Sequence, residues 1–456
     1  MSLTRRTFVA GAGTLAFAGL LNSFASKSIA ANNHSVKGYG PLVTDPDGIL
    51  DLPNGFSYKI ISEMGDRMDD GYFVPDRADG MGCFGLAGSQ VALVRNHEIG
   101  LDNHDPEMTK MQRGLQTVAF DETSEGYPLP GGTTTIIYDT KTGERINEYR
   151  SLIGTLRNCA GGVTPWRSWI TCEEIVSPEG EFGSHSHGWA FEVPVLGGYR
   201  FSKPEPLRGL GRFNHEAAAV DPSTGIVYMT EDRPNSLFYR FIPESYGQLN
   251  KGGKLQALGF KGQEKGGDSR NWDGVTFKQG DWHEVRWIDL DDTDSPKDDL
   301  RLRGHEKGGV FFARGEGITW GDNELYFCCT NGGVKGFGQI MRYQPSVNEG
   351  TISENDSPGR LQLFLESDVR NSFSFGDNLT VAPFGHLIVC EDNYDNTDNF
   401  VRGVTPEGSL YPFARLIVDS ETAGACFSPD GSILFINIQS PTKTLAITGP
   451  WDKFSV

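Results

Sequence analysis

Short runs of apolar residues recur along the chain from about residue 90, and turn residues precede each run. The runs are rich in Val, Ile, Leu, Tyr and Phe, and most of them end in acidic or amide side chains. The six clearest copies occupy residues 90–98, 167–174, 225–232, 323–331, 385–393 and 431–439. Short runs of this composition are typical of β-strands, and no long window has clean helical periodicity. The pattern therefore predicts an all-β protein.

The spacing of these runs predicts the architecture. Each interval can hold the four strands of a propeller blade, and the longest interval leaves room for an insertion. We therefore expect residues 31–456 to form one domain, a six-bladed β-propeller with loop insertions. A two-sheet sandwich is the alternative, but six repeats this far apart fit it poorly. In a propeller the polar strand ends would converge at one mouth of the channel, as a multi-metal site requires.

The run at residues 167–174 ends in one thiol and two carboxylates, Cys172, Glu173 and Glu174. Adjacent carboxylates repel each other and are costly to bury unless a cation or a hydrogen-bond network compensates. The alternative is a solvated acidic loop after the strand. Because side chains alternate along a strand, Glu173 and Glu174 should point to opposite sides. Of the two, we expect Glu173 to be the metal ligand.

Net charge restricts the partners. The 41 Lys and Arg residues against 60 Asp and Glu residues give a formal charge of −19. This balance argues against nucleic acid and anionic membrane surfaces as partners. An acidic protein that acts on an anionic substrate needs local cations, and bound metal ions would provide them.

The N-terminus has the pattern of an export sequence. Arg5 and Arg6 precede an apolar run at residues 9–21, and a small-residue cleavage site follows at residues 28–30. Residues 1–30 are therefore expected to be a twin-arginine signal peptide, which engages the Tat export machinery and directs the protein to the periplasm or the exterior. A stable membrane anchor is the alternative, but the run is too short and too rich in glycine.

The cysteines do not form a disulfide framework. The chain has seven, at positions 83, 159, 172, 328, 329, 390 and 426. Their number is odd and their spacing irregular, and no Cys-x-x-Cys pair suggests a structural zinc site.

The longest interval contains a segment at residues 252–299 that is rich in Gly, Lys and Asp, and we expect it to be a rim insertion. Its acidic run at residues 289–294 lacks the Gly and the terminal Glu of an EF-hand loop. We expect a solvated loop there rather than a calcium site.

Two further polar segments could carry chemistry. His215 and Glu216 precede a small apolar run, and they can supply an imidazole and a carboxylate. Arg314 and Glu316 project from the same face of an extended segment because they are two residues apart. An arginine beside a metal-binding carboxylate suits a phosphate ester. The alternative is a plain Arg–Glu surface pair.

Together these segments resemble the PhoX-type alkaline phosphatases. The matching motifs are Leu-Val-Arg-Asn-His-Glu at 93–98, Thr-Cys-Glu-Glu at 171–174, His-Gly-Trp-Ala-Phe-Glu-Val at 187–193, Gly-Arg-Phe-Asn-His-Glu at 211–216, the run at 225–232, Arg-Gly-Glu-Gly-Ile at 314–318 and Asp-Asn at 377–378. They occur in order over most of the chain that follows the N-terminal segment.

The resemblance implies a six-bladed propeller whose site holds two Fe³⁺ ions and three Ca²⁺ ions, joined by a bridging oxo group. It implies that Cys172 is the thiolate on iron, that Glu216 and Glu316 are metal ligands, and that Arg314 holds the substrate phosphate. Arg314, Glu316 and Cys172 would be the catalytic residues. The remaining metal ligands would be Glu173, Asn96, Glu98 and Glu231.

The function that follows is hydrolysis of small-molecule phosphomonoesters, with broad specificity, by an exported monomer. Two other classes remain open. A calcium-dependent propeller phosphodiesterase or lactonase would need no thiolate. A non-catalytic binding propeller would need few carboxylates at its strand ends.

Overall fold

A computed structural model describes residues 36–107, 114–195, 204–393 and 398–454. The predicted twin-arginine peptide at residues 1–30 lies outside this part of the chain. Among the described residues, no helix has the length and apolar character needed to span a membrane.

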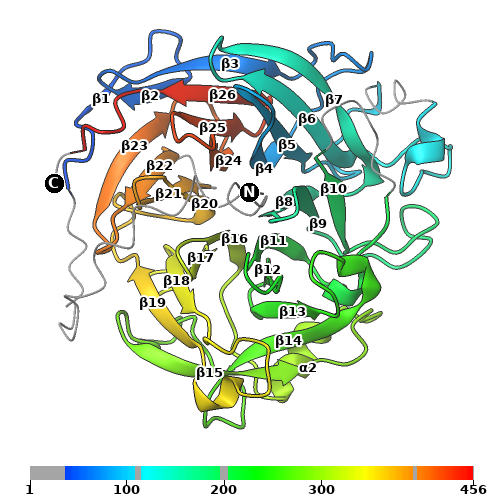
Figure 1. Ribbon diagram of the computed structural model, residues 1–456, viewed down its shortest axis with the longest axis vertical. Coiled ribbons are helices and arrows are strands. Elements are labelled where there is room, and N and C mark those ends of the chain that lie inside the picture. Colours follow the sequence, from blue (N-terminus) through cyan, green and yellow to red (C-terminus); the bar gives the residue numbers. More distant parts are fainter. Residues whose placement is uncertain (1–35, 108–113, 196–203, 394–397, 455–456) are drawn as a thin grey trace, which may run out of the picture.

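Within the described residues, five hydrogen-bonded sheets surround a central axis (Figure 1). The sheet that opens the ring contains β4 (Ala78–Gly85), β5 (Gln90–His97), β6 (Gly131–Asp139) and β7 (Glu144–Thr155). The next contains β8 (Asn158–Val163), β9 (Ser168–Glu173) and β10 (Ala190–Pro194). In both, the first strand lies nearest the axis, as in a propeller blade.

The largest sheet has nine strands. It runs from β11 (His215–Val220) through β12 (Val227–Glu231), β13 (Tyr239–Pro243) and β14 (Gly253–Phe260) to β15 (Trp282–Asp289). It continues through β19 (Arg360–Glu366), β18 (Gln339–Gln344) and β17 (Leu325–Cys329) to β16 (Gly315–Trp320). The strand β15 therefore joins two runs of four strands, and both runs begin at the axis.

Two sheets close the ring. One contains β20 (Gly376–Val381), β21 (Leu387–Glu391), β22 (Phe400–Val404), β23 (Leu410–Leu416), β2 (Leu50–Pro53) and β1 (Leu42–Val43). The other contains β24 (Thr422–Phe427), β25 (Ile433–Ile438), β26 (Lys443–Thr448) and β3 (Ser57–Glu63). Because β3 pairs with β26, the N-terminal and C-terminal parts of the described chain meet in one sheet. The prediction of an all-β, propeller-like fold is confirmed.

Helical segments are few and short in the described chain. They are α2 (Leu300–Glu306) and the 3₁₀ turns Gln116–Val118, Arg208–Leu210, Leu249–Lys251 and Glu354–Asp356.

The predicted rim insertion at residues 252–299 differs from expectation, because it contributes β14 and β15 to the nine-stranded sheet. Its acidic run is exposed and paired with cations, as a solvated loop would be. Asp291 is 77% exposed at its side chain and forms an ion pair with Lys307, and Asp289 pairs with Lys254.

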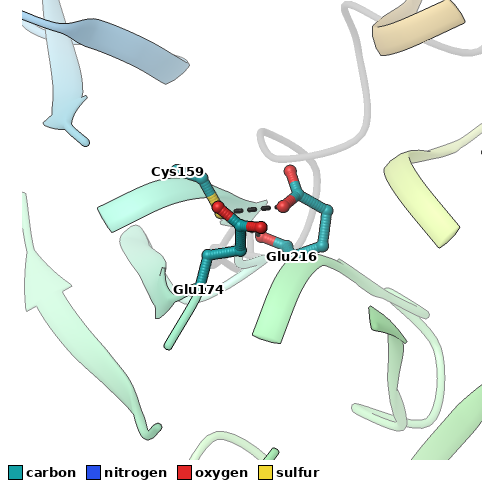
Figure 2. A group of neighbouring side chains, drawn as sticks. All are labelled: Cys159, Glu174 and Glu216. Atoms are coloured by element: carbon teal, nitrogen blue, oxygen red, sulfur yellow. Dashed lines mark hydrogen bonds between the residues drawn. The ribbon is translucent and has the colours of Figure 1, made fainter. Parts of the chain in front are cut away.

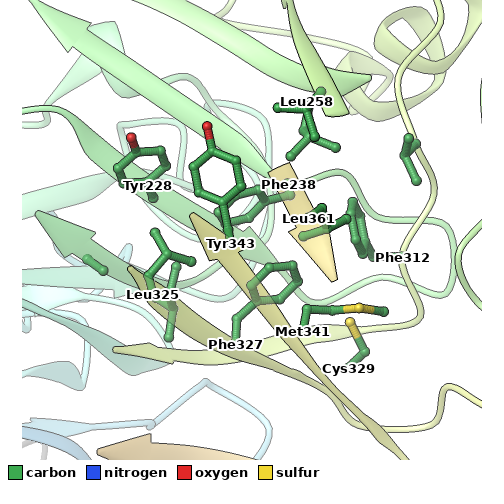
Figure 3. Packing of buried hydrophobic residues seen from close by; sticks show 14 of the residues in the cluster. Tyr228, Phe238, Leu258, Phe312, Leu325, Phe327, Cys329, Met341, Tyr343 and Leu361 are labelled. Carbon is green, nitrogen blue, oxygen red and sulfur yellow. The ribbon is translucent and has the colours of Figure 1, made fainter. Parts of the chain in front are cut away.

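The core lies between neighbouring sheets. In the nine-stranded sheet, aromatic and aliphatic side chains from its two runs pack together (Figure 3). Phe238 stacks on Phe327 with ring centroids 4.5 Å apart, and both are almost completely buried. Burial of such rings contributes roughly 1.5–3 kcal/mol each to stability. This packing holds the two runs of the sheet against each other and so helps to position their inner strands, β11 and β16, at the axis.

The six strands nearest the axis share one irregularity. In β4, β8, β11, β16, β20 and β24, the pairing with the next strand shifts near the start of the strand. The shifts lie between residues 78 and 81, 158 and 161, 215 and 218, 315 and 318, 376 and 379, and 423 and 426. A bulge re-aims the side chain of its extra residue, so the fold presents six equivalent positions around the axis.

Candidate metal centre

A cavity of about 810 Å³ opens at one end of the axis. Its charged lining consists of eleven carboxylates and three arginines, and Cys159 is the thiol among its lining residues. The carboxylates are Asp79, Glu98, Glu174, Glu216, Asp232, Glu316, Asp377, Asp392, Asp398, Asp419 and Glu421, and the arginines are Arg77, Arg157 and Arg314. The cavity therefore gathers far more negative than positive side chains.

The first set of lining residues comes from the bulges. The second residue of the shifted segment is Asp79 in β4, Cys159 in β8, Glu216 in β11, Glu316 in β16 and Asp377 in β20. All five line the cavity. The same β-bulge, repeated around the axis, thus brings five potential metal ligands together in the cavity.

The sixth bulge carries no side chain at this position. It has Gly424, whose φ is +63°, and a Cβ there would lie 2.4 Å from the carbonyl oxygen of Asp79. Only glycine fits this approach without a shift of the backbone. Glu421, three residues earlier, lines the cavity on this side instead.

The second set follows the ends of the neighbouring strands. Glu98, Glu174, Asp232 and Asp392 each come directly after the last residue of β5, β9, β12 or β21, and each lines the cavity. The residues just before them are His97, Glu173, Glu231 and Glu391, which pair across the sheet with the first residue of the bulge. Because side chains alternate along a strand, one member of each pair reaches the cavity and the other is directed elsewhere.

Three groups of side chains bring their ligand atoms within 4.8 Å of one another. They are Cys159 with Glu174 and Glu216, Asp79 with Glu98 and Glu421, and Glu216 with Glu316 and Asp377. Figure 2 shows the first group, in which the Sγ of Cys159 donates to the Oε2 of Glu216 at 2.9 Å. Glu216 belongs to two groups and so connects them.

Burial and mutual repulsion disfavour the charged forms of these carboxylates. Burial, followed by the charges of Glu316 and Glu174, raises the pKa of Glu216 well above its usual range. Burial and the neighbouring charges of Asp377 and Glu98 do the same for the pKa of Asp79. Bound cations would remove this repulsion, and the donors suit them: thiolate suits iron, and carboxylate oxygens suit calcium. The residues therefore fit a cluster of metal ions.

Two of the arginines are oriented by these carboxylates. Arg157 Nη2 lies 2.7 Å from carboxylate oxygens of both Glu98 and Glu174. Arg314 forms a bidentate pair with Asp232, through Nε at 2.7 Å and Nη2 at 2.8 Å. Its Nη2 also lies 3.1 Å from Glu316. These pairs fix the planes of both guanidinium groups at the cavity wall.

The structure brings four of the predicted site residues to the cavity: Arg314, Glu316, Glu216 and Glu98. Asn96 supports the site from behind. Its Nδ2 donates to the carbonyl oxygens of Cys159 and Ala160, and its Oδ1 accepts from Trp169 and Thr171. Asn96 thus holds the bulge of β8 in place and does not line the cavity.

The structure places Cys172, Glu173 and Glu231 away from the cavity. Cys172 is completely buried in an apolar cluster that includes Ile170 and Phe213. Glu173 accepts from His187 Nδ1 at 2.7 Å and from the amides of residues 156, 188 and 189. Glu231 accepts from the hydroxyl of Tyr239 and the amide of Leu237. The two glutamates occupy the outward-facing positions of the alternation and organise the loops behind the strands.

The cavity residues outside the expected set include Asp79, Cys159, Glu174, Asp232, Asp377, Asp392, Glu421, Arg77 and Arg157. Of these, Glu174 was the alternative to Glu173, and Asp377 lies in a motif of the family resemblance. A repeated pattern could have indicated some of them. Arginine stands two residues before Asp79, before Cys159 and before Glu316, as Arg77, Arg157 and Arg314.

We predict that removal of metal makes stability depend on pH. In the metal-free protein, burial raises the pKa of Asp377 to about 7, and the pKa values of Glu216 and Glu316 also rise. Since the folded state binds these protons more tightly than the unfolded state, their stabilisation is present below pH ~4 and is lost as the pH rises through ~7. Thermal unfolding with and without a chelator should show Tm falling by ~5 °C or more over this range only in the stripped protein. The same pH dependence in both forms would contradict the prediction.

Comparisons with known proteins agree with this architecture. The sequence matches the family described as alkaline phosphatase PhoX over residues 37–442. The structure is similar to that of Pseudomonas fluorescens PhoX in complex with vanadate, a transition-state analogue, with a TM-score of 0.67 and 18% identity over 92% of this chain and 98% of that one. The gluconolactonase XC5397 from Xanthomonas campestris is a more distant match, with a TM-score of 0.40 and 12% identity over 90% of this chain and 98% of that one. No curated protein sequence matched.

The family match spans most of the chain and includes all six bulges of the cavity wall. The P. fluorescens protein shares the fold over nearly its whole length. The protein belongs to the PhoX family of alkaline phosphatases.

Proposed function

We propose that the protein is an exported alkaline phosphatase that hydrolyses phosphomonoesters, with broad specificity, at a multinuclear iron–calcium site. The observation that carries the proposal is the convergence of five bulge residues and four strand-end carboxylates on one cavity that Arg314 also lines. Twin-arginine export, a periplasmic or secreted location and a monomeric state are parts of the same proposal. So is the count of six blades, which takes β11–β14 and β16–β19 as separate blades joined by β15.

The metal ligands follow the bulge positions. Cys159, with Glu174 and Glu216, offers the thiolate-containing group and is proposed for iron in place of Cys172. The two all-carboxylate groups suit calcium: Asp79 with Glu98 and Glu421, and Glu216 with Glu316 and Asp377. The ion count implied by the family resemblance, two Fe³⁺ and three Ca²⁺ with a bridging oxo group, is retained as part of the proposal. Bound cations would neutralise charge on phosphoryl oxygens and activate the attacking nucleophile.

Arg314 is proposed to position the phosphate. Its guanidinium is held on one edge by Asp232, and it lies 3.1 Å from Glu316, the bulge residue of β16. Arginine matches the oxygens of a phosphate through paired, charge-assisted hydrogen bonds, which a flexible lysine does not reproduce. The backbone of β16 and the carboxylate of Asp232 thus fix the direction in which the guanidinium of Arg314 would face the phosphoryl group.

The proposal is tested with the metal-loaded protein, p-nitrophenyl phosphate and elemental analysis. We expect hydrolysis at alkaline pH, loss of activity on chelation, and iron and calcium in the active sample. Arg314→Lys keeps the positive charge but loses the paired hydrogen bonds of the fixed guanidinium, so it should lower kcat/KM about 100-fold without changing the metal content. Full activity in an iron-free protein would overturn the metal assignment. Hydrolysis of a lactone or a phosphodiester but not of the monoester would place the protein in the other class of propeller hydrolases.

A further inference from the structure

Three arginines at the cavity wall share one backbone position. Arg77, Arg157 and Arg314 directly precede β4, β8 and β16, and their φ angles are 52°, 46° and 51°. A positive φ is uncommon for a residue other than glycine, and such strain persists where surrounding structure enforces it, often at functional sites. The repeated fold therefore places three guanidinium groups at equivalent positions in the cavity wall.

Arg77 differs from the other two in its partners. Arg157 and Arg314 each contact two carboxylates. Arg77 forms no ion pair with any carboxylate in the described chain, and its Nη1 donates to the amide oxygen of Gln439 at 3.2 Å. None of its nitrogen atoms is among the buried atoms without a partner. Its remaining N–H groups are therefore accessible to solvent, and Arg77 is among the residues that line the cavity.

Gln439 fixes the direction of Arg77. Its Nε2 donates to Glu98 Oε2 at 2.9 Å and to Asp79 Oδ2 at 3.4 Å. Because the amide nitrogen must face these two acceptors, the amide oxygen faces the guanidinium. A neutral side chain thus holds Arg77 beside the acidic cluster. No carboxylate of the described chain contacts the guanidinium directly, so no contact neutralises its positive charge.

Arg77 and Arg314 approach the cavity from opposite sides. Their strands, β4 and β16, are three positions apart in the ring of inner strands and lie across the axis from each other (Figure 1). On the side of Arg77 the cavity lining includes Ser440, whose Oγ donates to Asp76, and Ser420, whose Oγ accepts from the amide of Ser440. A phosphate held by Arg314 would therefore direct the rest of the substrate toward Arg77.

We propose that Arg77 binds a second anionic group, a carboxylate or a phosphate, on the leaving-group side of the substrate. The inference rests on the proposed phosphatase function and narrows its preferred substrates to esters with a second negative charge. The carboxylates of Asp398 and Asp419 at the outer rim do not oppose this strongly, because both residues are exposed to solvent and Asp398 pairs with Arg415.

The test compares two matched substrates, 4-carboxyphenyl phosphate and its neutral isostere 4-carbamoylphenyl phosphate, in the wild type and in Arg77→Gln. Loss of a hydrogen-bonded charge should lower kcat/KM for the carboxylate about 10-fold to 100-fold, and for the carbamoyl ester no more than about 2-fold. For each ester, kcat/KM of the variant is divided by kcat/KM of the wild type. This ratio cancels the difference in intrinsic reactivity between the esters. A third ester, 1,4-phenylene bisphosphate, shows whether Arg77 prefers a phosphate or a carboxylate.

Arg415→Gln is the control, since Arg415 pairs with Asp51 and Asp398 next to the cavity rim and its loss changes the net charge equally. Equal losses in both arginine variants, or equal losses on both esters in Arg77→Gln, would overturn the inference and leave the phosphatase function intact. Calorimetric titration with the corresponding non-hydrolysable phosphonates provides a readout that needs no catalysis. If the wild type hydrolyses none of the esters, the proposed function fails, but the titrations still test Arg77. Tighter binding of the carboxylate phosphonate than of the carbamoyl phosphonate, lost in Arg77→Gln, would support the role of Arg77. Equal binding of the two phosphonates by the wild type would contradict it.

Discussion

Replacing Cys159 with Ala is expected to lower phosphatase activity at least ~100-fold and to remove any visible colour of the purified protein, because the variant would lose the thiolate proposed to bind iron. Cys159 lies in the bulge of β8, with its Sγ within 4.8 Å of ligand atoms of Glu174 and Glu216. A thiolate on Fe³⁺ gives a charge-transfer absorption that a methyl group cannot give. The measurements are the visible spectrum, the iron content and the rate with p-nitrophenyl phosphate.

Cys172→Ala is the matched control for this variant. Cys172 is completely buried among apolar residues, so its truncation should cost roughly 1 kcal/mol of stability and leave the colour and the iron content unchanged. The opposite result, a colourless Cys172→Ala protein and a coloured Cys159→Ala protein, would restore the assignment first implied by the resemblance. It would also show that the bulges do not present the ligands.

Glu216→Gln is expected to have opposite effects on the loaded and stripped proteins. Glu216 belongs to two of the three ligand groups, so its loss should lower both iron and calcium content and reduce activity at least ~100-fold. In the stripped protein the same change removes a buried carboxylate whose pKa is raised by burial and by the charges of Glu316 and Glu174. Above neutral pH the stripped variant should therefore be more stable than the stripped wild type.

Elemental analysis and thermal unfolding with and without a chelator check both parts of this prediction. Glu173→Gln is the control on the neighbouring strand end, since Glu173 contacts His187 rather than the cavity. It should destabilise both forms by a similar amount, without loss of metal. A stripped Glu216→Gln protein that is less stable than the stripped wild type would contradict the view that this cluster is repulsive without cations.

The fold could be predicted from the sequence because its evidence is local. Short apolar runs with β-branched and aromatic residues predict strands wherever they occur, and their repetition around Ile170, Tyr228 and Ile388 predicts a propeller. The insertion at residues 252–299 was predicted as a rim segment, but two of its stretches pair with other strands. One of them, β14, pairs with β13 and β15, which are near in sequence, but β15 also pairs with β19, which is distant in sequence.

Four of the residues expected at the site, Glu98, Glu216, Glu316 and Arg314, line the cavity. The sequence shows them in strand ends and polar segments, and the family resemblance implied their roles. The choice between Glu173 and Glu174 could not be made from alternation, because alternation gives two opposite faces without saying which one meets the axis. The structure directs Glu174 to the cavity and Glu173 to His187.

The sequence by itself thus determined the class of fold and the acidic character of the site, since these depend on residue types and on periods of a few residues. Only the tertiary structure decided which thiol belongs to the cavity and which of the two residues at each strand end faces it. The reason is the bulge near the start of each inner strand. Its shift in register depends on pairing between strands, and it directs Cys159 into the cavity while Cys172 packs in the core.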